Sequence, residues 1–140
     1  MKKLISLSVL LLVVSFFSVN TLAVDKKTQT TVSKSAKIEV YYFHFTRRCV
    51  TCQAVETETQ AAIAALYPLQ AKNGLITFKA VNLDEKTSEA LAKKCKAEGQ
   101  ALLVISGGKR IDLTEQGFMY AKSSPDKLKA ELKKTIDPLL

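Results

Sequence analysis

The sequence predicts an α/β fold with a central mixed four-stranded sheet and helices on both faces. Three observations lead to this prediction. Short runs rich in β-branched and aromatic residues alternate with segments of helical periodicity. The first of these runs is apolar on both faces, as expected of a central strand covered on each side. The pair Gly107-Gly108 separates the last two runs, which is typical of a hairpin.

The first half of the predicted domain holds two strands joined by a helix. Residues 37–45 form the first strand, and residues 46–48 form a short loop. Residues 53–66 have the apolar stripe of an amphipathic helix, which Pro68 ends or kinks. The second strand is predicted over residues 75–83.

A second helix and a hairpin follow. Asp84 is a suitable N-cap for a helix that runs through Lys96, and Gly99 is a suitable stop. Residues 101–105 form a short, fully apolar third strand, and residues 109–113 form the fourth strand after the glycine pair. We interpret the first two crossovers as βαβ units, which predicts three parallel strands and an antiparallel edge strand.

The chain is predicted to end in an amphipathic helix. Ser124 is its expected N-cap and Pro125 its first residue, a position that proline favours. Leu128, Leu132 and Ile136 recur every fourth residue and are expected to face the core.

The N-terminal residues indicate export. Residues 1–23 begin with two lysines, continue as an apolar run and end in Thr-Leu-Ala, which is typical of a cleaved secretory signal peptide. A retained membrane anchor is the competing interpretation, although the run is short for a spanning helix. Residues 24–36 are predicted to be a flexible leader, and residues 37–140 to be one domain. We expect a periplasmic or extracellular protein without stable membrane insertion after cleavage.

The chain is basic. It carries 21 Lys+Arg against 13 Asp+Glu, a net charge of +8. The basic residues are not interleaved with aromatic ones, so the sequence does not indicate nucleic-acid binding. We expect a solvated basic surface rather than a dedicated anion or membrane site, and a monomer.

Cys49 and Cys52 lie two residues apart, between the first predicted strand and the first predicted helix. In an exported chain, this arrangement is typical of a redox pair. Unpaired amide N–H groups and the positive end of the helix dipole stabilise an anion at a helix start. That anion is the Cys49 thiolate, and Arg47 and Arg48 add positive charge beside it. We expect a Cys49 pKa below the ~8.5 of free cysteine.

These features resemble the thioredoxin-like superfamily over residues 37–140. The strand before the cysteines and the motif Cys49-Val50-Thr51-Cys52 carry the resemblance, and residues 41–49 are more similar to exported bacterial members than to thioredoxin itself. The resemblance implies a thiol–disulfide oxidoreductase without a cofactor. Its expected partners are protein thiols or disulfides and a redox partner that the sequence does not identify.

The chain departs from the family pattern at three positions. Arg48 replaces the tryptophan that usually precedes the first cysteine, and Gln100 stands where a cis-proline usually faces the disulfide. Phe43 takes the place where many members bury a carboxylate. We expect a trans bond at Gln100, because cis costs roughly 2.5–4 kcal/mol outside proline. Arg47, Arg48 and Gln100 are the candidate substrate-binding residues, and the missing proline predicts a restricted set of partners.

Cys49 is the expected attacking thiolate, and Cys52 is the expected resolving thiol that releases a mixed disulfide. A permanent disulfide is a weaker interpretation, because closing so small a loop removes little unfolded-state entropy. Metal binding would need further ligands, for which His44, Cys95 and Glu56 are the candidates. Copper(I) needs fewer ligands, so a non-catalytic copper(I)-binding module is the alternative function.

Two other residues have both a structural and a functional interpretation. Cys95 lies on the apolar side of its helix and is expected to be a buried free thiol, with a third redox thiol as the alternative. His44 is expected to be packed and hydrogen-bonded, with a proton carrier near the cysteines as the alternative.

Overall fold

The computed structural model describes residues 36–140, so the predicted signal peptide and all of the leader except Ala36 lie outside the described residues. Every strand predicted from the sequence is present. The elements follow one another as β1 (Ile38–His44), α2 (Val50–Leu66), α3 (Pro68–Lys72), β2 (Ile76–Asn82), the 3₁₀ helix η2 (Lys86–Ser88), α4 (Glu89–Cys95), β3 (Ala101–Ser106), β4 (Lys109–Asp112), α5 (Thr114–Tyr120), α6 (Pro125–Ile136) and the 3₁₀ helix η3 (Asp137–Leu139).

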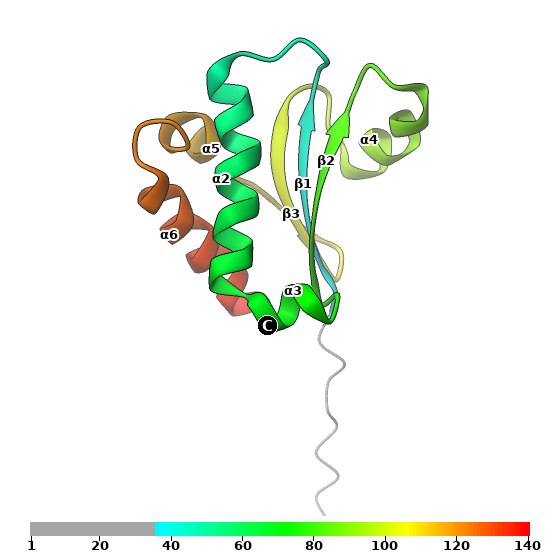
Figure 1. Cartoon of the computed structure of the whole chain (residues 1–140). Coiled ribbons are helices and arrows are strands. Elements are labelled where there is room, and N and C mark those ends of the chain that lie inside the picture. Colours follow the sequence, from blue (N-terminus) through cyan, green and yellow to red (C-terminus); the bar gives the residue numbers. More distant parts are fainter. Residues whose placement is uncertain (1–35) are drawn as a thin grey trace, which may run out of the picture. The chain divides into compact units, whose positions relative to one another are not determined.

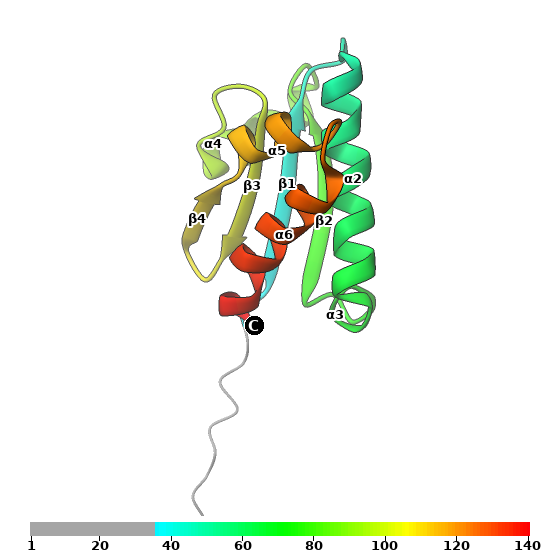
Figure 2. The same ribbon diagram turned by 90° about the vertical axis from the view of Figure 1, so that its left-hand side faces the viewer.

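The four strands form one mixed sheet in the order β2-β1-β3-β4 (Figure 1). β1 pairs with β2 in parallel and with β3 in antiparallel orientation, and β3 pairs with β4 in antiparallel orientation. Helices lie on both faces of the sheet (Figure 2). The predicted fold class is confirmed, and the arrangement is consistent with a thioredoxin-like fold.

The prediction of three parallel strands is wrong, because β3 runs opposite to β1 and β2. Asn82 at the end of β2 pairs with His44, and Ala101 at the start of β3 pairs with Phe43. The connection from β2 to β3 therefore begins and ends at the same end of the sheet. Its helix α4 has only seven residues, which rise about 10 Å against the roughly 23 Å of a seven-residue strand. So short a helix does not carry the chain back along the sheet.

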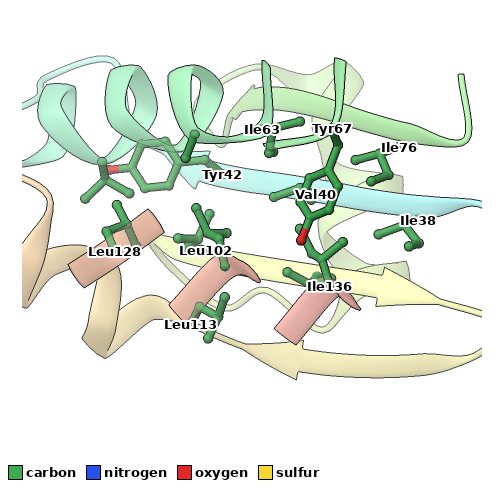
Figure 3. Close-up of a cluster of buried hydrophobic side chains, with 14 of the residues drawn as sticks. Ile38, Val40, Tyr42, Ile63, Tyr67, Ile76, Leu102, Leu113, Leu128 and Ile136 are labelled. Carbon is green, nitrogen blue, oxygen red and sulfur yellow. The ribbon is translucent and has the colours of Figure 1, made fainter. Parts of the chain in front are cut away.

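The main core lies between the sheet and the helices α2, α5 and α6. Alternate residues of β1 face this layer, and the next ones face α4, which explains why the strand is apolar on both sides. The main cluster includes Ile38, Val40, Tyr42, Val55, Ile63, Leu102, Val104, Leu128, Leu132 and Ile136 (Figure 3). A smaller cluster under α4 includes Tyr41, Phe43, Val81, Ala92, Cys95, Ala101 and Leu103.

Helix α5 was not predicted. It starts directly after β4, and its residue Gly117 packs against the sheet and α2. A Cβ atom at this position would lie 3.2 Å from Leu102 Cδ2 and 3.3 Å from Val55 Cγ1. The glycine therefore permits a close approach of three elements, and the same glycine weakens the helical pattern in the sequence.

The predicted hairpin and last helix are confirmed. Gly107 and Gly108 both have positive φ, 54° and 85°, as a two-residue turn of type I′ requires. Val104 pairs with Ile111 across the two antiparallel strands. Helix α6 begins at Pro125 and buries its three predicted apolar residues. Among residues 36–140, no helix combines the length and the apolar character needed to cross a bilayer.

Candidate functional site

The loop that leads to the cysteines is held to the end of β2. The Thr46 backbone N–H donates to Asp84 Oδ2 at 2.7 Å, and Asn82 Nδ2 donates to Thr46 Oγ1 at 2.9 Å. The first of these bonds lowers the pKa of the Asp84 carboxyl. The prediction that Asp84 caps the next helix is wrong, because its carboxylate is used by this loop and α4 begins only after Ser88.

Cys49 is the N-cap of α2, which starts at Val50, three residues before the predicted start. Its Sγ accepts the backbone N–H of Cys52 at 3.4 Å, and the two sulfur atoms are 2.8 Å apart. Cys49 is exposed, whereas Cys52 is only 5 % exposed. The pair therefore combines an accessible sulfur with a covered one, close enough that a disulfide bond of about 2.05 Å needs little movement.

The pKa values of the two thiols are shifted in opposite directions. The hydrogen bond with the Cys52 side chain, followed by the backbone N–H groups of Cys52 and Thr51, lowers the pKa of Cys49. Burial, followed by the hydrogen bond with Cys49, raises the pKa of Cys52. The lowered Cys49 pKa agrees with the sequence prediction, but its cause is the Cys52 thiol and the helix amides rather than the two arginines. Cys49 is therefore the thiol that ionises first.

The candidate substrate-binding residues lie at the same end of the sheet. Arg47 is exposed on the loop, and Arg48 forms an ion pair with Glu56 of α2. Gln100 directly precedes Ala101, which pairs with Phe43 near the end of β1. Peptide bonds within residues 36–140 are all trans, as predicted for Gln100. The Gln100 Oε1 atom is buried and accepts no hydrogen bond from the described residues.

Tyr42 is a residue of the site that the sequence analysis missed. Its hydroxyl is buried and has no hydrogen-bond partner within the described residues. It lies near enough to the Cys52 thiol for the two groups to influence each other's pKa. Figure 3 shows the Tyr42 side chain on the α2 side of the sheet. The family resemblance placed Phe43 where many members bury a carboxylate near the cysteines, but Phe43 lies in the cluster under α4. Side chains of a strand alternate between its two faces, so Tyr42 lies on the same face as the core-facing Val40. This alternation is the sequence signal that could have identified Tyr42.

We predict that Tyr42→Phe raises the pKa of Cys52. Burial raises that pKa most, and the nearby Tyr42 hydroxyl opposes the rise. Without the hydroxyl, the pH profile for closure of the Cys49–Cys52 disulfide from a mixed disulfide should move to higher pH. Stopped-flow measurement across pH 6–10 checks this shift.

Tyr120→Phe is the matched control, because Tyr120 lies on α5 and its ring contacts Lys127. This variant should keep the profile of the unmodified protein. A profile that is the same in all three proteins would exclude a role for the Tyr42 hydroxyl.

His44 and Cys95 are both buried side chains. His44 is 7 % exposed, its Nδ1 lies 3.0 Å from the Phe45 carbonyl oxygen, and its ring centroid lies 5.7 Å from that of Tyr42. Cys95 is the last residue of α4 and is buried between this helix and the sheet, and burial raises its pKa. Phe45, the last residue of the predicted first strand, lies after the end of β1 and is 39 % exposed. Among the described residues, no three or more His, Cys, Asp or Glu side chains gather as a metal site.

The three cysteines should differ in reactivity. In reduced, folded protein near neutral pH, we expect iodoacetamide to modify Cys49 first, because it is exposed and its pKa is lowered. Cys52 should react later and Cys95 slowest, since burial raises both of their pKa values. Timed quenching and peptide mass spectrometry give the order. Modification of Cys95 before Cys49 would favour the interpretation of Cys95 as a third redox thiol.

Comparisons with known proteins identify no family. No protein-family model matches the chain, and no curated protein matches it. Among solved structures, one described as "Structure of a malarial protein" is similar, with 22 % sequence identity and a TM-score of 0.45. The similarity covers 70 % of this chain and 96 % of that one.

Proposed function

We propose that this protein is an exported thiol–disulfide oxidoreductase in which Cys49 and Cys52 form the redox pair. The observation that carries the proposal is the contact between an exposed thiol of lowered pKa and a buried thiol of raised pKa. A structural disulfide needs no such difference in exposure and pKa. Thiol–disulfide exchange needs one sulfur that attacks the substrate and a second that resolves the mixed disulfide.

The exchange proceeds in two steps. The Cys49 thiolate attacks one sulfur of a substrate disulfide, forms a mixed disulfide and releases the other substrate sulfur as a thiolate. Cys52, after losing its proton, attacks Cys49 Sγ, closes the Cys49–Cys52 disulfide and releases the second substrate thiolate. The substrate gains two electrons, and the pair loses two. The same steps in reverse oxidise a substrate dithiol, and a redox partner with its own dithiol or disulfide restores the pair.

The surroundings of the pair support a protein substrate. Cys49 is exposed at the helix start, and Arg47 beside it is exposed and free to contact an acidic segment. Arg48 is held by Glu56, so it contributes a fixed rather than a mobile side chain. The backbone before Ala101, at the same end of the sheet, has the N–H group of Gln100 where a proline would have none.

The reduction potential of the pair tests the proposal. The protein is equilibrated in dithiothreitol and glutathione redox buffers, and the oxidised fraction is read by alkylation and mass spectrometry. Cys95→Ala serves as the background, so that one pair titrates. A potential between roughly −120 and −270 mV supports a catalyst. A value below about −300 mV would contradict the proposal and favour a non-catalytic binding module, for which copper(I) held by the two sulfurs is the alternative ligand.

A further inference from the structure

A cavity of about 380 Å³ lies on the α4 face of the sheet. Its floor comes from β1 and β3, and its walls come from the C-terminal end of α4 and the β3–β4 turn. Lys37 and Ser106 line this cavity, and Ile38 pairs with Ser106 at the start of β1. Cys49 follows the opposite end of β1, so this cavity, here called the α4 cavity, is separate from the redox pair.

The α4 cavity concentrates positive charge. Its lining contains Lys37, Lys94, Lys96 and Arg110 against the single carboxylate of Glu39. Arg110 is already engaged, because its guanidinium donates to the Cys95 and Lys96 carbonyl oxygens and pairs with Asp112. The three lysines form no ion pair within residues 36–140, so their charges are available to an anionic ligand.

Neutral donors and an apolar wall complete the cavity. Ser106 lines it and is 95 % buried, with 5 % of its surface exposed, and its hydroxyl makes no hydrogen bond within the described residues. The Ser106 hydroxyl is not sealed from solvent, so it can donate to a ligand that enters the cavity. Leu91 and Ile105 provide apolar surface in the same cavity.

We propose that the α4 cavity binds a small organic phosphate monoester. A dianionic head group offsets the lysine charges and accepts the Ser106 hydrogen bond, while a short apolar group contacts Leu91 and Ile105. From the sequence, a solvated basic surface is expected; three of those lysines instead line one cavity together with the Ser106 hydroxyl. This inference does not depend on the redox function, because the site shares no residue with Cys49 and Cys52.

Titration of the oxidised, ¹⁵N-labelled protein with butyl phosphate tests the proposal. We expect saturable shifts of amide signals from Leu91 to Lys96 and from Ser106 to Gly108. Cys95 lines the cavity, so bound butyl phosphate should also slow its alkylation by about fivefold or more. Inorganic phosphate and 1-butanol, each carrying half of the recognised chemistry, should bind more weakly by about tenfold or more.

Two triple variants separate the cavity from general charge. Changing Lys37, Lys94 and Lys96 to glutamine should weaken butyl phosphate binding by about tenfold or more. Changing the exposed Lys72, Lys122 and Lys134 to glutamine lowers the net charge equally and should leave affinity within about twofold. Equal loss in both variants, absence of saturable shifts, or equal affinity for inorganic phosphate would overturn the proposal. The slower alkylation of Cys95 is measured in the unmodified protein, so this test remains valid even if a variant does not fold.

Discussion

Replacing Cys52 by serine is expected to stop the proposed exchange at the mixed disulfide. Cys49 keeps its position at the helix start and still attacks a substrate disulfide. The sulfur that lies 2.8 Å away and would release the substrate is then absent. The mixed disulfide should accumulate, and turnover should fall by roughly 100-fold or more.

Intact-mass spectrometry of the Cys52→Ser protein, incubated with a disulfide-containing peptide, measures the adduct directly. Cys49→Ser is the matched control and should give neither turnover nor adduct, because the buried Cys52 thiol has a raised pKa. Both variants carry Cys95→Ala, so that an adduct is assigned to one sulfur. Accumulation of adduct on Cys52 in the control, or undiminished turnover in Cys52→Ser, would reverse the proposed roles.

Leu128→Ala should cost about 2–5 kcal/mol of stability, a large part of the 5–15 kcal/mol typical of a domain. Leu128 is fully buried on α6 and points into the main core (Figure 3). Its truncation removes apolar contacts between α6 and the sheet and leaves a cavity that neighbouring side chains fill only in part.

Urea unfolding of the oxidised protein, followed by circular dichroism, gives the loss in free energy. The control is Leu69→Ala on α3, where the same truncation removes a side chain that is 73 % exposed. That variant should change stability by no more than about 0.5 kcal/mol. Similar losses in the two variants would show that α6 does not hold the core together.

The strands and the contact between the two cysteines were predictable because each has a local signal. Apolar runs define the strands, the glycine pair defines the hairpin, and Cys49 and Cys52 lie at a spacing that one helical turn brings together. The direction of β3 has no local signal. It depends on how far α4 extends, and η2 and the end of α4 at Cys95 shorten the helix that the pattern predicts.

The neighbours of the cysteines depend on contacts between distant residues. Asp84 is a residue type typical of N-caps, yet its carboxylate accepts a hydrogen bond from the backbone N–H of Thr46, in a loop 38 residues earlier. Arg48 precedes Cys49 in the sequence, but its guanidinium forms an ion pair with the Glu56 carboxylate of α2. Tyr42 reaches Cys52 because one strand face packs under the helix start. Such pairings become visible only when the elements are packed together.

The unequal covering of the sheet has a dynamic consequence. Within residues 36–140, the helices α2, α5 and α6 cover one face, whereas the other is covered by α4, which has seven residues and a separate small cluster beneath it. Opening of α4 exposes that cluster and leaves the main core intact, so α4 amide hydrogens should exchange at a lower free energy than those of α2. The cysteine pair, anchored on α2, would keep its geometry through such openings, while the face that holds Cys95 fluctuates.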